Sequence, residues 1–317
     1  MAKPTLTIII PAYHVADTLE RCVKSVTSQD FQSWQTIIVD DGSTDGTPQI
    51  ADELASNDTR IITVHKSNGG LSDARNHALD ILFGKTTASE NLPLGITDYV
   101  TFIDSDDYLR PGTFTPLMEE LANHPEYDIL EYSATLHAGS EREEEMTLSH
   151  DFYTASRDYW LRAQAYRHAY AWNKIYKSNI FSSGHRYAKG KLFEDVWILP
   201  GILKSHPNVA TTPKGRYIYT DNPKGITHSA AKEASQSAEL LHAHCNALSS
   251  LGIDLTAPSL SKEEARLYLS LRNQQRSVRL LDPDFPAILP SRHIPFKAAT
   301  TIREFIKIFF YNYLGLK

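Results

Sequence analysis

Segments with the pattern of strands alternate with segments with the pattern of helices along about the first 110 residues of the chain. The runs predicted as strands are LTIIIPAY (6–13), WQTIIVDDGS (34–43), RIITVHK (60–66) and DYVTFIDSDD (98–107), with YDILEYSA (127–134) as a fifth. Between them, DTLERCVKSV (17–26) and LSDARNHALDIL (71–82) each place apolar residues on one side of a helix. Strands that alternate with helices form a mainly parallel sheet covered on both faces, so we expect an α/β fold.

The turns that follow the first four predicted strands are polar, and two of them contain glycine. They are Pro11-Ala12-Tyr13, Asp40-Asp41-Gly42-Ser43, Lys66-Ser67-Asn68-Gly69-Gly70 and Asp104-Ser105-Asp106-Asp107. In open α/β sheets, ligands bind at the carboxyl ends of the strands. The sequence therefore predicts a ligand site at this edge of the sheet.

The composition restricts the class of ligand. The 317 residues carry a formal net charge of −6, which lacks the basic excess of a nucleic-acid-binding protein, so we expect no nucleic-acid partner. Two cysteines, Cys22 and Cys245, do not make a disulfide framework, and they fit a reducing, cytoplasmic compartment. The apolar run at residues 6–10 is too short for a signal peptide, and no segment reaches the roughly 20 apolar residues that cross a bilayer.

Three carboxylates, Asp104, Asp106 and Asp107, follow the fourth predicted strand. Carboxylates this close repel one another unless a cation lies among them. Without clustered cysteine or histidine they suit Mg²⁺ or Mn²⁺, and the Asp-x-Asp spacing lets one hold a phosphate-bound metal while the other contacts ribose. The alternatives are a solvated loop, or caps for the helix after Pro111; Asp107 either caps that helix or orients Asp106.

The end of the second predicted strand suits a nucleobase. The carboxylate of Asp41 can accept the ring N–H of a uracil-type base, a donor that cytosine lacks, and Gly42 lets the backbone turn sharply. The alternative is an ordinary Asp-Gly turn. Tyr13 offers a ring on which a base could stack, or it is a half-buried aromatic residue at a strand end.

In NGGLSDARN (68–76), two glycines precede a predicted helix, whose N-terminus would attract anions. Arg75 could reach a phosphate or pair with an acid. Neither a Walker A motif nor G-x-G-x-x-G is present, which excludes a phosphate-binding loop and a dinucleotide fingerprint.

Two further segments combine polar and apolar residues. In FEDVW (193–197), Glu194 and Asp195 could serve as bases, because apolar surroundings raise a carboxyl pKa, or they could cap a helix. In AWNKIY (171–176), the Trp-Asn-Lys run either lines a pocket or belongs to the core. His228 is an isolated histidine in KGITHSA (224–230), and the residues around it indicate no role for it.

Together these motifs resemble the family 2 glycosyltransferases, inverting enzymes of the nucleotide-diphospho-sugar transferase (GT-A) fold. The similarity runs in order through TIIIPAYHVADTLERCVKSVTSQDFQSWQTIIVDDGSTDGT, NGGLSDARN, YVTFIDSDDYLRPGT, WNKIY and FEDV. It covers roughly the first two-thirds of the chain, and the joint order and spacing are specific.

The resemblance implies an α/β GT-A fold with a mixed, mostly parallel central sheet and a C-terminal helical extension. Residues 1–230 would form the catalytic domain, with 1–115 as its nucleotide-binding half and 116–230 as its acceptor half. Residues 231–317 would form a helical C-terminal region.

The resemblance also assigns site residues. Those implied to bind the nucleotide sugar are Pro11, Ala12, Tyr13, Asp41, Asn68, Gly70, Arg75, Asp104 and Ser105. In this family the residue at Tyr13 lies against the uracil, Asp41 binds the base and Asp40 supports the turn. The ligands implied for Mn²⁺ or Mg²⁺ are Asp106 and, as a weaker candidate, His228. The catalytic base comes from Glu194 and Asp195, most often from the aspartate.

The implied activity is that of a metal-dependent hexosyl- or N-acetylhexosaminyltransferase. It would move a sugar from a UDP-sugar donor to a hydroxyl of a glycan or lipid-linked oligosaccharide, in capsule, exopolysaccharide or lipopolysaccharide synthesis. One alternative is a sugar-nucleotide nucleotidyltransferase, which usually has a basic glycine-rich loop near the N-terminus that PAYHVADTLE lacks. Another is a non-catalytic sugar-nucleotide-binding subunit.

The chain departs from the family pattern at three points. An extra stretch at 85–96, expected to be a surface loop, precedes the Asp-x-Asp strand. No Gln-x-x-Arg-Trp motif and no transmembrane bundle is present, which argues against a processive synthase such as those for cellulose or hyaluronan. Residues after about 230 match nothing specific.

The C-terminal sequence TIREFIKIFFYNYLGLK (301–317) places apolar residues on one helical face, with Arg303, Lys307 and Lys317 off that face. Such a helix could lie on an anionic membrane at the inner face of the plasma membrane, as a peripheral contact that fits a lipid-linked acceptor. The alternative is packing onto the domain or onto a partner in a homodimer.

Overall fold

The structure is a computed structural model that describes residues 4–86, 88, 91–223, 225, 233–289, 291–294, 296, 299, 305–306, 308–309 and 312. The chain divides into two compact units. The first comprises Met1–Thr154, Tyr170–Lys191 and Ser205–Asn222, and the second Ala155–Ala169, Leu192–Lys204 and Pro223–Lys317. The functional division expected at residue 230 stays a prediction.

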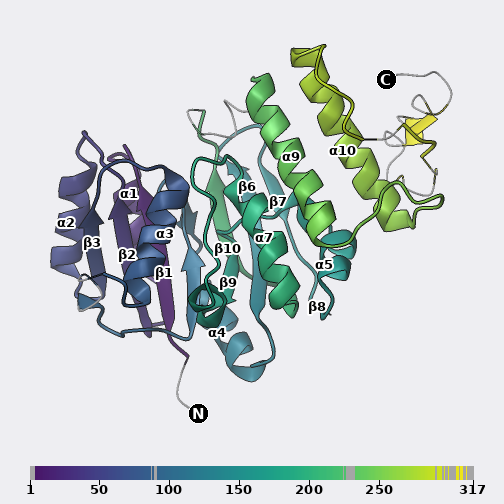
Figure 1. The fold of residues 1–317 in the computed structure, drawn as a ribbon. Helices are drawn as coiled ribbons and strands as arrows, with labels where there is room; N and C mark the ends of the chain where they lie inside the picture. Colours follow the sequence, from purple (N-terminus) through teal and green to yellow (C-terminus); the bar gives the residue numbers. More distant parts are fainter. Residues whose placement is uncertain are drawn as a thin grey trace. The chain divides into compact units, whose positions relative to one another are not determined.

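The first unit is built on one mixed sheet with the strand order β3-β2-β1-β4-β9-β6-β10-β5. Figure 1 shows β3, β2 and β1 side by side at the left of the view. The strands are β1 Leu6–Ala12, β2 Trp34–Asp40, β3 Ile61–His65, β4 Tyr99–Phe102, β5 Tyr108–Leu109, β6 Ile129–Ala138, β7 Glu144–Met146, β8 Asp151–Tyr153, β9 Lys174–Lys177 and β10 Val209–Thr220. Strands β3, β2, β1 and β4 are parallel neighbours, and so are β6 and β10. Strand β9 runs antiparallel between β4 and β6. The predicted mixed, largely parallel sheet is therefore confirmed.

The helices of the first unit are α1 Leu19–Thr27, α2 Thr47–Asn57, α3 Leu71–Leu82, α4 Phe114–Asn123 and α6 Ser178–Ser182. Helix α1 buries Leu19, Cys22, Val23 and Val26, the apolar face expected from the sequence. Helix α3 packs against β1 and β2, and α2 packs against β2 and β3. These contacts fix the parallel strands whose carboxyl ends carry the polar turns.

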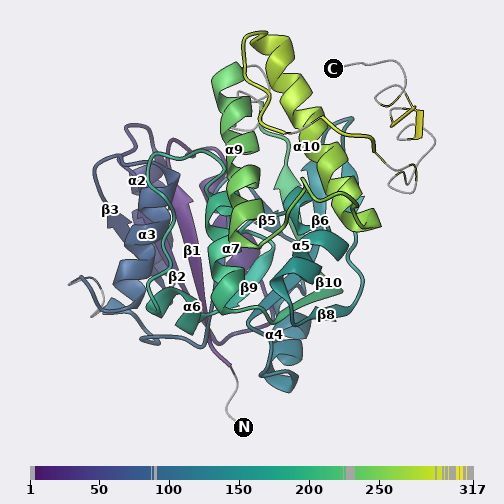
Figure 2. The same cartoon turned by 45° about the vertical axis from the view of Figure 1, so that its right-hand side comes forward.

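The second unit is helical in its described part. Its helices are α5 Ser156–Arg162, the 3₁₀ turn Ala165–Arg167, α7 Glu194–Ser205 up to its last residue, α9 Ala234–Ser250 and α10 Lys262–Leu281. Helices α9 and α10 lie side by side (Figure 2). Ser261 and Glu264 form a capping box that starts α10. The expected C-terminal helical extension is confirmed, and no helix among the described residues is long and apolar enough to span a membrane.

Candidate functional site

Four strand ends of the first unit meet at one edge of the sheet, because β1, β2, β3 and β4 are parallel. In the strand register Ala12 lies opposite Asp40, and Asp40 lies opposite His65. The ladder continues one step further, since the Asp41 N–H donates to the Ala12 carbonyl at 2.9 Å. Pro11 and Ala12 are the last two residues of β1 and are buried, so they lie at this edge as part of the strand.

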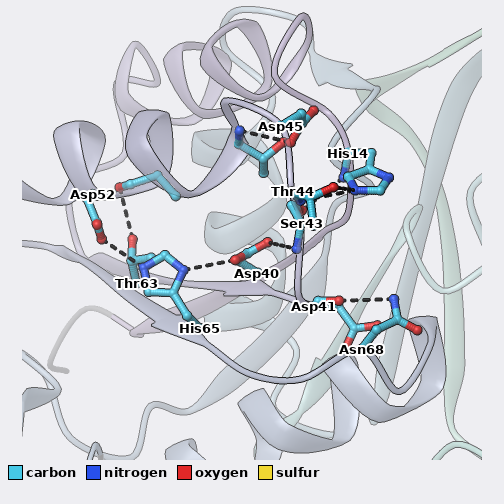
Figure 3. Close-up of polar contacts among 12 residues, drawn as sticks. His14, Asp40, Asp41, Ser43, Thr44, Asp45, Asp52, Thr63, His65 and Asn68 are labelled. Atoms are coloured by element: carbon cyan, nitrogen blue, oxygen red, sulfur yellow. Dashed lines mark hydrogen bonds and ion pairs between the residues drawn. The ribbon is translucent and has the colours of Figure 1, made fainter.

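Tyr13 presents an aromatic ring at this edge. The ring is 48% exposed and stacks on His14, with centroids 4.1 Å apart and planes at 26°. His14 adopts a left-handed backbone conformation, with φ +52°. Its backbone N–H donates to Ser43 Oγ at 3.0 Å, and the Thr44 N–H donates to its Nε2 at 3.1 Å (Figure 3). The loop after β2 therefore fixes His14, and the His14 ring supports one face of the Tyr13 ring, which is predicted to stack on a base.

Asp41 is buried, with 3% of its surface exposed. Its carboxylate accepts hydrogen bonds from Lys66 Nζ at 2.6 Å and from the N–H groups of Gly69 and Gly70 at 3.0 and 2.7 Å. The Asn68 side chain donates to the Asp41 carbonyl at 3.0 Å (Figure 3). Asp41 therefore ties the end of β2 to the loop before α3, and its recognition of a base stays a prediction.

Lys66 links two carboxylates. Its Nζ lies 2.6 Å from Asp41 and 2.6 Å from Asp73 in the first turn of α3. Burial alone would lower the pKa of Lys66, but the hydrogen bonds to Asp41 and Asp73 outweigh it and raise the pKa. Asp73 also pairs with Lys189, and these two lysines lower its pKa.

Gly42 is required by its surroundings. It has φ +80°, and a Cβ at this position would lie 2.7 Å from the backbone nitrogen of Asn68. The sharp turn expected at Gly42 therefore brings β2 against the backbone of the loop before α3.

Arg75 and Asp104 form a pair at the end of β4. Arg75 Nη2 donates to Asp104 Oδ1 at 2.8 Å, and only 1% of the arginine is exposed. The guanidinium also lies over the rings of Phe102 and Tyr187, with its central carbon 5.7 and 5.2 Å from their centroids. Of the two roles open to Arg75 from the sequence, the structure has the pairing with an acid.

Asp106 is bound by two residues distant in the sequence. Asn222 Nδ2 donates to its Oδ2 at 2.8 Å, and Arg21 Nη2 donates to its backbone carbonyl at 2.5 Å. Burial raises the pKa of Asp106, and the charge on Asp104 raises it further. Negative charge here is therefore costly until a cation offsets it. Ser105, between the two acids, is buried.

Asp107 has no exposed surface. Its carboxylate accepts from the hydroxyl of Tyr217 at 2.9 Å and from the N–H of Thr220 at 2.7 Å, both on β10. Burial, together with Asp106 and Asp104, raises its pKa well above the ordinary range. The N-cap position of helix α4 is Thr113, whose side chain makes no capping hydrogen bond, and the Asp107 carboxylate bonds to β10 rather than to α4. Instead, Asp107 fastens the acidic loop to β10.

The other predicted residues lie in the second unit, in the core of the first unit or outside the described residues. Glu194 and Asp195 form the first turn of α7 in the second unit, and Glu194 is buried. His228 lies outside the described residues, so its role as a metal ligand stays a prediction. Trp172, Asn173 and Lys174 are all buried, so they belong to the core of the first unit.

Sequence reasoning missed His65, Lys66, Tyr217 and Asn222. His65 and Lys66 end the third predicted strand. Because parallel strands end at the same edge of a sheet, the predicted parallel sheet could have placed them beside Asp40 and Asp41. Tyr217 and Asn222 come from β10 and the residues just after it, more than a hundred residues from the acids they contact, and no local signal marks them.

The acidic loop offers the oxygen ligands that Mg²⁺ or Mn²⁺ prefers, and the raised pKa of Asp106 reflects a charge that a cation would offset. In the described part of the chain, no group of three or more histidine, cysteine or acidic side chains could hold a metal ion.

This chain is similar to known proteins both in sequence and in fold. The chain is 27% identical over 252 residues to the uncharacterized glycosyltransferase EpsJ of Bacillus subtilis, covering 73% of this chain and 65% of EpsJ. It is 28% identical over 234 residues to the glycosyltransferase GlyA of Streptococcus pneumoniae, covering 68% of this chain and 30% of GlyA. The chain thus spans less than two-thirds of the length of these relatives.

The fold matches a crystal structure of S. aureus TarS residues 1–349 in complex with UDP-GlcNAc, with a TM-score of 0.62 and 19% identity, over 86% of this chain and 73% of that one. The family model for glycosyl transferase family 2 matches residues 7–188, which is more than half of the chain and includes the whole acidic loop. The chain belongs to glycosyl transferase family 2 and has the GT-A fold.

Proposed function

We propose that this protein is an inverting glycosyltransferase that moves a sugar from a UDP-sugar to a hydroxyl group of a glycan or a lipid-linked glycan. The observation that carries the proposal is the acidic loop at the end of β4. Asp104 forms an ion pair with the buried Arg75. Asp106 accepts a hydrogen bond from Asn222, and the nearby charge of Asp104 raises its pKa. A partly buried excess of carboxylate oxygens at the carboxyl end of a parallel strand suits a cation that accompanies a diphosphate.

The other end of the donor is assigned to the turns of β1 and β2. Tyr13 offers a ring backed by His14, on which a base can stack. Asp41 is an acceptor close by, and a uracil N–H would have to share or displace one of the three donors that now bind its carboxylate. We assign Asp104 and Ser105 to the ribose side and Asp106 to the diphosphate side.

The reaction is a single displacement at the anomeric carbon. Asp195 takes the proton of the acceptor hydroxyl, whose oxygen forms a bond to that carbon as the bond to the diphosphate breaks and UDP leaves. When bound, Mn²⁺ or Mg²⁺ would neutralise the charge that grows on the departing diphosphate. Tyr13, Asp41 and Asp104 position the donor, which reduces the entropic part of the barrier.

We assign the product to cell-surface polysaccharide, as the resemblance of the sequence motifs to family 2 glycosyltransferases implies. The TarS structure whose fold matches this one was crystallised with UDP-GlcNAc. UDP-GlcNAc is for that reason the first donor to test. The acceptor is assigned by class alone, as a hydroxyl of a growing glycan.

A thermal-shift screen of UDP-sugars with and without Mn²⁺ tests the proposal. We expect at least one UDP-sugar to raise the melting temperature, and the rise to be larger with Mn²⁺. If no UDP-sugar and no UDP stabilises the protein under either condition, the proposal is wrong.

The Asp195→Asn variant separates an enzyme from a binding subunit. We expect it to lose turnover by a factor on the order of a hundred or more while it retains UDP binding. Asp158→Asn, at an exposed carboxylate on α5 that pairs with the exposed Arg162 at 3.7 Å, is the matched control and should keep full activity.

A further inference from the structure

A histidine joins two carboxylates beneath the loop that follows β2. His65, the last residue of β3, has Nδ1 at 2.9 Å from Asp40 Oδ2 and Nε2 at 3.0 Å from Asp52 Oδ1 (Figure 3). Asp40 is 2% exposed, whereas Asp52 lies on the outer surface of α2 with 65% of its side chain exposed. The three side chains form a chain from the solvent to the buried end of β2.

Both ring nitrogens of His65 face carboxylates, and only a protonated imidazole can donate to both. The hydrogen bond to Asp40 is the largest influence that raises the pKa of His65, burial opposes it, and Asp52 raises the pKa further. A buried carboxylate such as Asp40 is costly unless it is paired, and its pairing with His65 favours the charged imidazole.

Asp40 controls the turn that follows it. Its second oxygen, Oδ1, accepts from the Ser43 N–H at 3.0 Å, which closes the turn over Asp41 and Gly42. Ser43 in turn accepts from the backbone of His14, the residue on which the Tyr13 ring stacks. The position of Asp40 thus bears on both candidate contacts to the base.

The charged groups around His65 come from the elements on both sides of it. Asp40 faces it from β2 and Asp52 from α2, while Lys66, the next residue of the chain, pairs with Asp41 and Asp73 instead. Thr63 Oγ1 donates to the Ala51 carbonyl at 2.9 Å, which fixes β3 against α2 next to Asp52 (Figure 3).

We infer that His65, in its protonated form, is a positioning residue that holds Asp40 and thereby the turn that presents Asp41 and Ser43 to the nucleotide, and that Asp52 keeps His65 protonated. This inference rests on the proposed function, since it takes the turn to be the base-binding side of a UDP-sugar site. It assigns a role to Asp52, a surface carboxylate of α2 that bonds to His65.

The direction of the pH effect follows from the raised pKa. His65 stays protonated at a pH where a free histidine would be neutral, and the link to Asp40 weakens as pH rises through the folded-state value. UDP affinity should fall over the same range. Removing the charge of Asp52 should move this fall to lower pH, without any change at the turn itself.

The experiment measures UDP affinity by calorimetry from about pH 6 to about pH 9. Asp52→Asn should match the wild type at the acidic end and bind about two- to fivefold more weakly near neutral pH, because its His65 loses the proton earlier. Glu53→Gln, which removes an exposed charge from the neighbouring position of α2, is the matched control and should follow the wild type. His65→Lys, which keeps a positive charge throughout, should flatten the profile.

A second readout does not depend on UDP. In protein with labelled histidine rings, the His65 resonance, identified by its loss in His65→Gln, should titrate at lower pH in Asp52→Asn than in the wild type. A lowered His65 titration with an unchanged UDP profile would overturn the inference. An unchanged His65 titration would overturn the role of Asp52. If the wild type binds no UDP at any pH, the proposed function is wrong and the inference fails with it, while the histidine titration still reports on the Asp40–His65–Asp52 chain.

Discussion

At the scale of single residues, the three acids of the loop after β4 have different roles: Asp107 is structural, whereas Asp104 and Asp106 are assigned to the ligand. Asp107 accepts two hydrogen bonds from β10 and is fully buried. Its removal leaves the Tyr217 hydroxyl and the Thr220 N–H without their acceptor, so Asp107→Ala should lower the free energy of unfolding by about 1–3 kcal/mol. Chemical denaturation measures this loss.

Asp106→Ala is the comparison at the neighbouring position. We expect it to abolish the Mn²⁺-dependent part of UDP-sugar binding with a smaller loss of stability, because its carboxylate accepts a hydrogen bond from the Asn222 side chain and is less buried than that of Asp107. Equal stability losses in the two variants would contradict this division of roles.

The residues that the sequence could identify are those next to one another in the chain. Asp104 and Asp106 stand out because three acids follow a buried strand, and Tyr13 and Asp41 because they end strands that must be parallel neighbours. The residues of β10 and just after it that bind the acidic loop could not be found this way. A contact such as Asn222 with Asp106 spans the chain and depends on how β10 enters the sheet.

At the scale of elements, a buried ion pair joins β6 and β9. Lys174 Nζ lies 2.9 Å from Glu131 Oε1, and neither side chain has any exposed surface. The ammonium also donates to the Tyr170 carbonyl and to the Asn173 side chain, so every one of its protons has an acceptor.

Lys174→Met should therefore lower the free energy of unfolding by about 3–5 kcal/mol, because it removes the ammonium that offsets the charge of Glu131 in the core. The double variant Lys174→Met/Glu131→Met should recover much of that loss, and urea unfolding of both proteins measures it. A single variant as stable as the double variant would show that the pair does not hold the two strands together.

The elements that the sequence predicted best are those with a regular period. The first four strands and helices α1 and α3 follow the patterns expected of them, within a few residues at their ends. Strand β6 begins two residues later than expected and continues to Ala138. Strands β9 and β10 were not predicted, because β9 is only four residues long and β10 is interrupted by irregular pairing with β6, so neither shows a clear alternation.

At the scale of the whole molecule, the chain ends in apolar residues of the second unit. Phe305, Ile306 and Phe309 are each nearly half exposed, while Ile308 is buried. The membrane-binding helix expected over 301–317 lies mostly outside the described residues, so the choice between a membrane and a protein partner stays open to experiment.

Flotation with anionic vesicles, without detergent, tests the membrane proposal. We expect the full chain to float and a version that ends at Pro295 to stay at the bottom, and we expect high salt to weaken flotation because Arg303, Lys307 and Lys317 supply part of the attraction. Equal behaviour of the two proteins would rule the membrane proposal out and favour packing within the protein or a homodimer.

The two charged pairs at the ends of β2 and β3 also bear on how the sheet assembles. Asp40 bonds to His65 and Asp41 bonds to Lys66, with the first pair directed toward α2 and the second toward α3. Because side chains alternate between the two faces of a sheet, a slip of one residue between these strands would place acids and bases on opposite faces. It would leave buried charges unpaired, so the residues assigned to the nucleotide also restrict β2 and β3 to one register while the chain folds.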